Sequence, residues 1–489
     1  MASLNPAPRL RVREIEFYEW PYTLRLPFRF GVITVTHGRQ IVARARIELD
    51  DGRSGWGVAA EALGAKWFDK DPAISDDDNL DQLRLALEIA AANYLSHDLE
   101  TAFGHFAAAY GPQLATGEKH RLNHLVASYG PAMIDRCVID ALGKLLGLSF
   151  NAMIKANAAG FVPSLLIDDL DGFAFDDFLA GLQPLSRLHV RHTVGMVDPI
   201  VAADQTAAAR VNDGLPETLE EIVAHYGQTY FKLKVGGDVE KDVARLTSIA
   251  SVLDRMKVPY KATLDGNEQY ADAAGVLELW RAIEASPKLQ RLKDSIIFIE
   301  QPIKRQMALS QDVSALAAKR PVILDESDGD LGAFPKGRKL GYAGISSKNC
   351  KGFYKSILNR ARCAWWNAQE STDRYFMSAE DLTTLPGISV QQDMALVALL
   401  GLGHVERNGH HFINGMSGRP IGEQRAFLAA HPGLYYEADG VVRLKADGVV
   451  RLKIDNGMVD LRSLDCPGFA VAAEPDWSSL ERMPASKWR

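Results

Sequence analysis

The hydrophobic residues between positions 188 and 406 gather in short runs, and most of these runs stop at a charged residue. Short apolar runs of this kind are typical of parallel strands that are buried on both faces. Segments with helical periodicity separate them, for example residues 239–256 and 354–367. Eight strands that alternate with helices predict an α/β fold with a closed (β/α)8 barrel. The strand candidates are residues 188–194, 229–235, 260–265, 295–300, 321–325, 343–348, 374–379 and 403–406.

An open, doubly wound sheet is the alternative architecture for this part of the chain. Such sheets commonly carry a glycine-rich phosphate loop after the first strand. No such loop follows residues 188–194, and Gly236-Gly237 after the second strand is too short to count. The pattern therefore favours the barrel.

The first part of the chain has a different pattern. Residues 11–22 and 40–48 alternate polar and apolar positions, and Asp50-Asp51-Gly52 then predicts a hairpin turn. Residues 78–154 are helical in pattern, with one helix over 132–146 that stops near Gly147. We therefore predict an α+β domain over 1–186, the barrel over 187–406, and a C-terminal segment over 407–489.

Two segments interrupt these patterns. Residues 160–186 are rich in Asp, Phe and Gly and predict a long connection or an insertion. Residues 438–445 read Ala-Asp-Gly-Val-Val-Arg-Leu-Lys, and residues 446–453 repeat the same eight. Each copy combines an Asp-Gly turn with a short alternating strand, so we predict a surface hairpin rather than a repeat architecture.

Charged residues stand where the predicted barrel strands end. Because the C-terminal strand ends of a barrel open into one mouth, these side chains are expected to meet there. Three carboxylates at one mouth make a site of hard oxygen ligands, which favours Mg²⁺. The alternative is that they are unrelated helix N-caps, but Glu is a poor N-cap. The residues are Lys232, Lys234, Asp265, Glu300, Asp325 and Lys348.

The lysines around this site predict a proton-transfer enzyme. Lys232 and Lys234 lie two residues apart, so they share one face of their strand. Lys234 and Lys348 would lie on strands two and six, at opposite sides of the mouth. A carbon acid bound between them could lose a proton from one face and regain it on the other, while a metal stabilises the developing charge. We expect the metal and the neighbouring lysine to lower the pKa of each lysine.

The sequence resembles the enolase superfamily, and within it the muconate-lactonising-enzyme-like subgroup of the mandelate racemase/muconate lactonising enzyme family. That superfamily uses Lys or His bases together with Mg²⁺. The resemblance extends over most of the chain. The matching motifs are Lys232-x-Lys234, Asp265-x-Asn267, Glu300-Gln301-Pro302, Asp325-Glu326-Ser327, Lys348, residues 26–31, Asp51-Gly52 with Gly55-Trp56-Gly57, and residues 134–144.

The resemblance implies a TIM-type barrel with an α+β capping domain, built from the N-terminal region and the C-terminal tail. It implies that Asp265, Glu300 and Asp325 bind Mg²⁺ and that Lys234 and Lys348 form the acid/base pair. Lys232 would help to hold the substrate carboxylate, and Asn267 would support the site. It also implies a homo-oligomer.

The sequence departs from the family pattern at several points. Val58 follows Gly-Trp-Gly where the family often has Glu, and extra residues occur near 60–120 and 160–186. The seventh strand ends in Ser378-Ala379-Glu380-Asp381 without a His, which argues against a mandelate-racemase-like His/Asp pair. Glu380 is either an acid at a helix start or a substrate contact. Candidate substrate contacts from the cap are residues 20–22 and 30–36.

These observations predict a Mg²⁺-dependent enzyme that removes the proton α to a carboxylate, as a racemase or epimerase. A lyase with the same site, either an acid dehydratase or a cycloisomerase, is the first alternative. A catalytically silent homologue that only binds a metal or ligand is the second. The expected partner is a small-molecule carboxylate.

Composition excludes several other classes. The 489 residues contain 55 Lys and Arg against 62 Asp and Glu, a net charge of −7, so no basic excess suggests nucleic acid. The four cysteines form no Cys-x-x-Cys pair, which fits a reducing cytoplasm. No signal peptide and no membrane span are expected.

Overall fold

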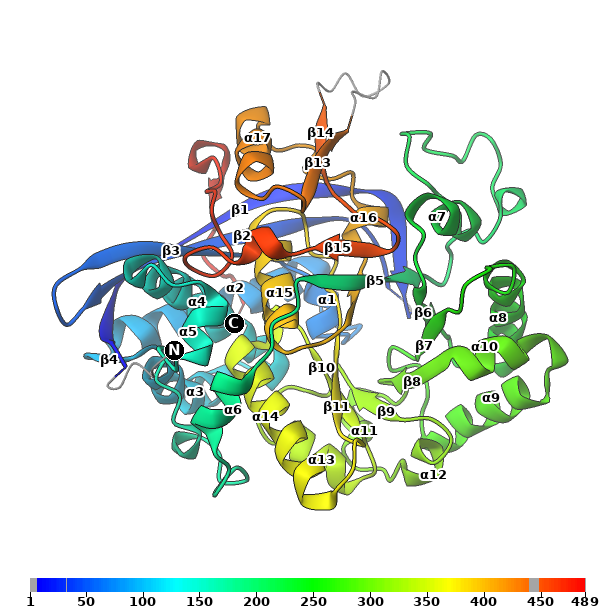
Figure 1. Ribbon diagram of the computed structural model, residues 1–489, viewed down its shortest axis with the longest axis horizontal. Coiled ribbons are helices and arrows are strands. Elements are labelled where there is room, and N and C mark those ends of the chain that lie inside the picture. Colours follow the sequence, from blue (N-terminus) through cyan, green and yellow to red (C-terminus); the bar gives the residue numbers. More distant parts are fainter. Residues whose placement is uncertain (1–6, 32, 439–447, 489) are drawn as a thin grey trace.

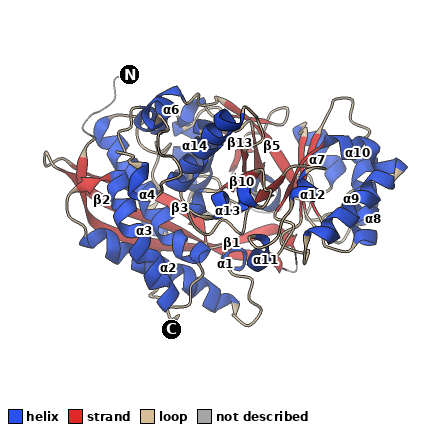
Figure 2. Cartoon of the chain, turned by 90° about the horizontal axis from the view of Figure 1, so that it is seen from below, coloured by secondary structure: helices blue, strands red, loops and turns tan. Residues whose placement is uncertain are grey.

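The computed structural model describes residues 7–31, 33–438 and 448–488. A barrel and a second layered unit pack together along the long axis of the molecule (Figures 1 and 2). None of the described helices is long and apolar enough to cross a membrane.

The barrel is built from eight parallel strands. Each strand pairs with its neighbours in chain order, and β12 pairs with β5 to close the ring. All eight strands fall on the regions predicted from the apolar runs, which confirms the (β/α)8 fold. The strands are β5 (Arg187–Val194), β6 (Tyr230–Lys234), β7 (Lys261–Asp265), β8 (Ile296–Glu300), β9 (Val322–Leu324), β10 (Gly344–Ser347), β11 (Phe376–Ala379) and β12 (His404–Arg407).

Helices connect these strands on the outside of the barrel, and several begin at side-chain caps. Thr218 and Glu221 form a capping box at the start of α7, and Asp238 caps α8. The predicted helices over 239–256 and 354–367 correspond to α8 and α14. The helices are α7 (Leu219–Tyr226), α8 (Val239–Leu253), α9 (Ala273–Ala285), α10 (Gln290–Ser295), α11 (Arg305–Ala308), α12 (Ser314–Ala317), α13 (Ala333–Lys339), α14 (Phe353–Glu370) and α15 (Ile388–Leu399).

The capping domain is an antiparallel sheet covered by helices. Strand β1 (Arg9–Phe30) pairs with β2 (Ile33–Leu49), and β2 pairs with β3 (Ser54–Ala62) through the predicted turn at Asp50 to Gly52. The C-terminal strand β16 (Glu481–Arg482) joins this sheet beside β1, as does the short β4 (Glu100–Thr101). The C-terminal tail therefore returns to the cap.

Helices α2 (Asp76–Ser96), α3 (Ala102–Lys119) and α4 (His124–Leu146) cover the cap sheet. Gly57 of the Gly-Trp-Gly motif faces α4 so closely that a Cβ there would collide with the Cys137 carbonyl. Helix α4 ends at Gly147, whose φ of 67° is left-handed, as the sequence predicted.

The segment predicted as a long connection carries little regular structure. It follows α5 (Phe150–Lys155) and contains one short turn, Pro163–Leu165, and helix α6 (Phe175–Gly181). Asp169 from this segment accepts hydrogen bonds from the Arg362 guanidinium of α14, which ties it to the barrel.

The C-terminal segment contains α16 (Gly409–Phe412), α17 (Ile421–Ala430), β15 (Met458–Asp460) and a hairpin of β13 (Tyr435–Ala438) and β14 (Val449–Leu452). The hairpin strands pair antiparallel, with Ala438 opposite Val449. Strand β14 belongs to the second copy of the repeated octapeptide. Residues 439–447, which include most of the first copy, lie outside the described residues.

The far half of the β1–β2 hairpin reaches across the barrel mouth. Arg25 of β1 makes two hydrogen bonds of 2.6 Å to Asp213 in the loop between β5 and α7, and both side chains are buried. Arg25 also donates to the backbone oxygen of His411. These contacts hold the cap over the strand ends, where the charged residues lie.

Candidate active site

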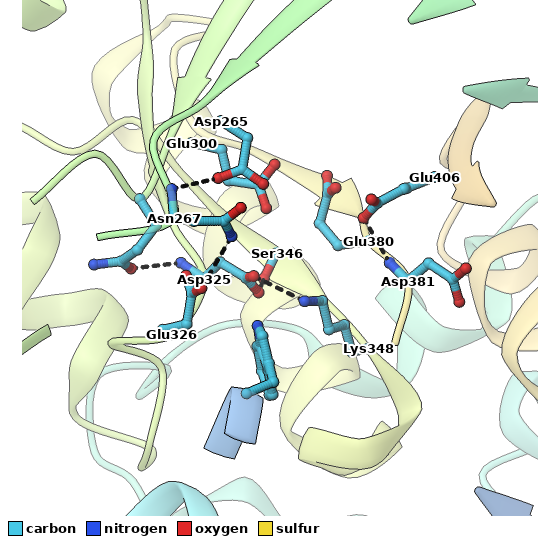
Figure 3. Close-up of polar contacts among 12 residues, drawn as sticks. Asp265, Asn267, Glu300, Asp325, Glu326, Ser346, Lys348, Glu380, Asp381 and Glu406 are labelled. Carbon is cyan, nitrogen blue, oxygen red and sulfur yellow. Dashed lines mark hydrogen bonds and ion pairs between the residues drawn. The ribbon is translucent and has the colours of Figure 1, made fainter. Parts of the chain in front are cut away.

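The charged residues predicted from the sequence meet at the C-terminal mouth of the barrel. Lys234, Asp265 and Glu300 end β6, β7 and β8, while Asp325 and Lys348 directly follow β9 and β10. All five are buried. Figure 3 shows Asp265 and Glu300 on one side of the mouth, with Glu380 and Glu406 opposite.

Lys232 lies at the centre of a group of acidic residues. Its Nζ is 2.8 to 2.9 Å from an oxygen of each of four carboxylates, and the side chain is almost fully buried. Burial alone would lower the pKa of Lys232, but the surrounding carboxylates outweigh it and the pKa is raised. We call this group the Lys232 cluster; it consists of Lys232, Asp265, Glu300, Glu380 and Glu406.

The second group is centred on a carboxylate. Asp325 accepts a hydrogen bond of 2.8 Å from the Lys348 ammonium and one from the Ser346 hydroxyl, and Lys351 lies 3.5 Å away. Burial would raise the pKa of Asp325, but Lys348 and Lys351 hold it below its usual range. We call this group the Asp325 cluster; it consists of Asp325, Ser346, Lys348 and Lys351.

The two predicted acid/base lysines come from opposite sides of the ring, because β6 and β10 are separated by three strands in either direction. Lys234 donates to Asp265 at 2.6 Å. Lys348 lies between Asp325 and the ring of Trp67, with Nζ 3.9 Å from the ring centroid. Both lysines line the same cavity.

The lowering of the lysine pKa values was expected beside a bound metal and stays a prediction; without a metal, the pKa of Lys348 is raised. Burial favours the neutral amine, but the Asp325 carboxylate outweighs it and raises the pKa. The Trp67 ring also favours the ammonium form. Sequence reasoning counted the other lysine and a metal, but it did not weigh the carboxylates that surround each ammonium.

A cavity of about 760 Å³ lies between the barrel mouth and the cap. Its floor contains Lys232, Lys234, Lys348, Asp325 and Asn267, and its walls come from β1, β2 and the segment after β3. Pro21, Tyr22 and Phe30, which lie in the predicted cap contacts, are part of the wall. Trp20 lies elsewhere, 4.8 Å from the Arg419 guanidinium, and Val32 is outside the described residues.

No protein-family model matches the sequence, and a comparison with curated proteins gave no match. Solved structures do match over nearly the whole chain. A dipeptide epimerase from Cytophaga hutchinsonii, solved with Mg and a dipeptide, has a TM-score of 0.60 at 13% identity, covering 97% of this chain and 99% of its own. A muconate lactonizing enzyme from Pseudomonas fluorescens gives 0.57 at 18% identity, covering 96% and 98%.

A third structure, a member of the enolase superfamily from Roseovarius nubinhibens ISM solved with magnesium, gives a TM-score of 0.55 at 16% identity, covering 97% of this chain and 98% of its own. The fold is that of the enolase superfamily. The resemblance predicted from the motifs is therefore confirmed at the level of the fold.

Within this enolase-superfamily fold, the carboxylates offer suitable donors for a divalent cation. Glu300 has one buried carboxylate oxygen without a hydrogen-bond partner, and burial together with Asp265 and Glu380 raises its pKa. A cation at this oxygen would favour the ionised form. However, no three acidic, imidazole or thiol side chains among the described residues are gathered closely enough to hold a metal as they stand. As they stand, Asp265 and Glu300 pair with Lys232, and Asp325 pairs with Lys348.

Asn267 borders the floor. Its backbone N–H donates to Asp265 at 2.8 Å, and its side-chain amide donates to Glu326 at 3.2 Å. Its φ of 40° lies in the left-handed region, a strained conformation that surrounding contacts must hold in place. Its carboxamide oxygen is buried without a partner. Asn267 therefore fixes one carboxylate and leaves an oxygen acceptor beside the cavity.

The interpretation of Glu380 as an acid at a helix start is wrong. Helix α15 begins eight residues later, at Ile388, so Glu380 is not an acid at a helix start. Its side chain pairs with Lys232 and Arg191 and accepts from the Ser378 hydroxyl. The Glu380 carboxylate thus balances two buried cations, and the substrate contact stays a prediction.

Sequence reasoning missed three residues of the site. Glu406 is the third residue of β12, so the rule used for Asp265 and Glu300, a charge closing an apolar run, could have found it. Lys351 follows Lys348 by three residues and could have been noticed as a second lysine. No signal pointed to Trp67, because it lies on α1 (Ala65–Phe68), a helix of four residues that is too short to show a periodic pattern.

Proposed function

We propose that this protein is a Mg²⁺-dependent enzyme of the enolase superfamily that removes the proton α to a substrate carboxylate, acting as a racemase or epimerase. The observation that carries the proposal is the placement of Lys234 and Lys348 on opposite strands of the barrel, both facing one cavity. A planar carbon acid bound between them would present one face to each amine.

The metal would be held by Asp265, Glu300 and Asp325, and it would supply positive charge next to the carboxylate oxygens of the substrate. For these residues to act together, Asp265 and Glu300 must be released by Lys232, and Asp325 by Lys348. Lys232 would then be free to bind the substrate carboxylate, since it also borders the cavity.

Lys348 and Lys234 would carry out the proton transfers. The Lys348 ammonium, held between Asp325 and Trp67, is placed to donate a proton to one face. Lys234 is placed to accept the α-proton on the opposite face. In the reverse direction the two lysines exchange roles, as a racemase requires.

A lyase is the second candidate, and the unequal surroundings of the two lysines favour it. Lys348 has a carboxylate and an aromatic ring, whereas Lys234 has the Asp265 carboxylate that it shares with Lys232. A pair with such different environments also suits elimination, in which one lysine takes the proton and the other does not exchange it.

The first test is calorimetric titration of metal-stripped protein with Mg²⁺. Glu300→Gln is expected to weaken binding by at least about tenfold, because it removes a ligand charge, whereas Glu278→Gln on the exposed side of α9 leaves it unchanged. Equal affinity in all three proteins would remove Glu300 from the metal site. No saturable binding in wild type would favour a silent homologue.

The second test measures how fast carboxylic acids exchange their α-hydrogen in deuterated solvent in the presence of the protein. Lys348→Ala should slow exchange at the substrate face next to Lys348 by about 10²–10⁴-fold. Lys336→Ala, at an exposed position on α13, should leave the exchange rate unchanged. Exchange from both faces in Lys348→Ala would exclude the two-lysine mechanism. Loss of water from the substrate, seen by mass, would favour the lyase.

A further inference from the structure

The cavity is larger than a small acid needs. Its volume of about 760 Å³ falls in the upper part of the range for small-molecule sites. An acid with only a few carbon atoms would contact the lysines of the floor and leave most of the space to water. The remaining volume lies against the cap, so the cap walls indicate what the rest of the substrate looks like.

The middle of the cavity is walled by apolar side chains. Phe28 of β1 packs against Phe412 of α16, with ring centroids 4.4 Å apart, and Phe28 and Phe30 lie 5.7 Å apart. Packed rings of this kind form a firm wall that cannot easily move to admit a charge. The apolar wall residues are Leu24, Phe28, Phe30, Leu63, Trp67 and Leu382.

The polar groups of the same walls are mainly hydroxyls, and the Asp381 carboxylate beside them is already paired with the Arg407 guanidinium at 2.9 Å. Tyr22, Thr34, Thr36 and Thr383 contribute hydroxyl groups to the lining. Thr383 has a φ of 57°, which is rare for a β-branched residue and costs energy that the surrounding loop must supply. Hydroxyls can donate to or accept from a neutral polar group of a ligand, but they do not compensate a charge.

The basic residues at the outer rim already have partners. Arg39 donates to Glu19 and to Glu481, at 2.5 and 2.9 Å. Lys66 donates to the Ile74 carbonyl at 2.6 Å and lies 3.5 Å from Asp76. Apart from the floor lysines, the remaining basic residue along the described lining is His37, which is exposed.

A second carboxylate at the outer end would therefore meet an unfavourable environment. It would lie near Asp76 and Asp77, both exposed at the rim, and near cations that other carboxylates already neutralise. An ammonium would be unsatisfied in the apolar middle, and pairing with Asp76 or Asp77 at the rim would add little because both carboxylates are exposed.

From these observations we infer that the substrate is a monocarboxylate with a large, uncharged and mainly apolar body. This inference rests on the proposed function for the floor, where the carboxylate would bind. It disfavours cycloisomerisation of a diacid, because along the described lining the second carboxylate would meet no basic side chain without a carboxylate partner except the exposed His37.

The test compares four acids by calorimetry with wild-type protein at saturating Mg²⁺: propanoate, 5-phenylpentanoate, heptanedioate and 7-aminoheptanoate. 5-Phenylpentanoate is expected to bind at least about tenfold more tightly than each of the others, because only its outer end is apolar. Equal or tighter binding of the diacid, the amino acid or propanoate would overturn the inference.

A positive charge introduced into the cavity wall should reverse the order in which the acids bind. Val35→Arg, at a half-buried lining position, is expected to strengthen heptanedioate binding and weaken 5-phenylpentanoate binding, each by at least about fivefold. Val162→Arg, exposed and away from the cavity, is the matched control. An unchanged order in Val35→Arg would contradict the assignment of this wall.

Exchange of the α-hydrogen separates the two proposals. If 5-phenylpentanoate binds as expected but none of the acids that bind exchanges its α-hydrogen, the proton-transfer function fails while the substrate class stands. If exchange occurs only with propanoate or heptanedioate, the function stands and the substrate class is overturned.

Discussion

The two charged clusters at the barrel mouth are built in opposite ways. In the Lys232 cluster one ammonium lies among four carboxylates, whereas in the Asp325 cluster one carboxylate receives two lysines and a hydroxyl. Both are buried, where an unpaired charge is costly and breaking a pair usually destabilises. The difference shows that several carboxylates share one ammonium in the first cluster, whereas several donors share one carboxylate in the second.

Removing the central lysine should have the largest effect. Lys232→Met leaves four buried carboxylates without their shared cation, so we expect the free energy of unfolding to fall by about 3–5 kcal/mol. Urea unfolding measures this change. Added Mg²⁺ should restore part of the loss, because a cation near Asp265 and Glu300 replaces the missing charge.

The matched comparison is Asp325→Asn, which removes the charge at the centre of the other cluster. Its amide oxygen still accepts from Ser346, and Lys351 keeps its ion pair of 3.0 Å with Asp328. Asp325→Asn should therefore cost less than Lys232→Met. Equal losses would show that the two clusters do not differ as described.

Glu61 is a buried carboxyl whose cation lies further away than Lys232 lies from its carboxylates, so it shows the effect of burial more directly. It is buried at the cap, with Arg136 3.4 Å away, and burial raises its pKa from 4.5 to about 7. Between these pH values the unfolded chain loses the proton and the folded chain keeps it, so stability falls as the pH rises. The shift corresponds to roughly 3 kcal/mol.

Glu61→Gln should remove this part of the pH dependence. Urea unfolding gives the free energy of unfolding of wild type and variant at pH 4.5 and at pH 7.5. The change in this free energy between the two pH values, compared between the two proteins, isolates the contribution of Glu61. If the free energy of unfolding changed equally with pH in both proteins, Arg136 would compensate the Glu61 carboxylate as fully as Lys232 compensates its partners.

The smallest expected effect concerns Trp67, which lies against Lys348 of the Asp325 cluster. Trp67→Leu removes the ring that favours the Lys348 ammonium, an interaction of about 0.5–2 kcal/mol. Because the ammonium loses this stabilisation, Lys348 should give up its proton at a pH lower by roughly 0.4–1.5 units. The pH profile of α-hydrogen exchange from the Lys348 face should shift accordingly, and Trp365→Leu on α14 serves as control.

The barrel could be predicted from the sequence because each strand is a short apolar run that ends in a charge at a fixed place in the fold. Lys234, Asp265, Glu300 and Lys348 were found in this way. Phe30 of the apolar wall lies in the predicted cap segment 30–36, but Trp67 was not found, because its position depends on how the four-residue helix α1 (Ala65–Phe68) packs over the mouth. Charge balance around Glu380 was also missed, since it depends on Arg191 from a strand far away in the sequence.

Several expectations stay predictions. The division at residues 186 and 406, a homo-oligomeric assembly and a cytoplasmic location depend on properties that contacts within one chain do not determine. The observed strands run from Arg187 to Arg407, and β16 adds to the cap sheet.

The hairpin of β13 and β14 bears on how this chain can change in length. Ala438 pairs with Val449, and the sequence just before Val449 is Asp447-Gly448. Loss of residues 439–446 would join Ala438 to Asp447 and leave Asp-Gly as a two-residue loop, the kind that hairpins prefer. Every strand residue would keep its partner and its face of the ladder. Eight codons can therefore be gained or lost at this turn without a change of register.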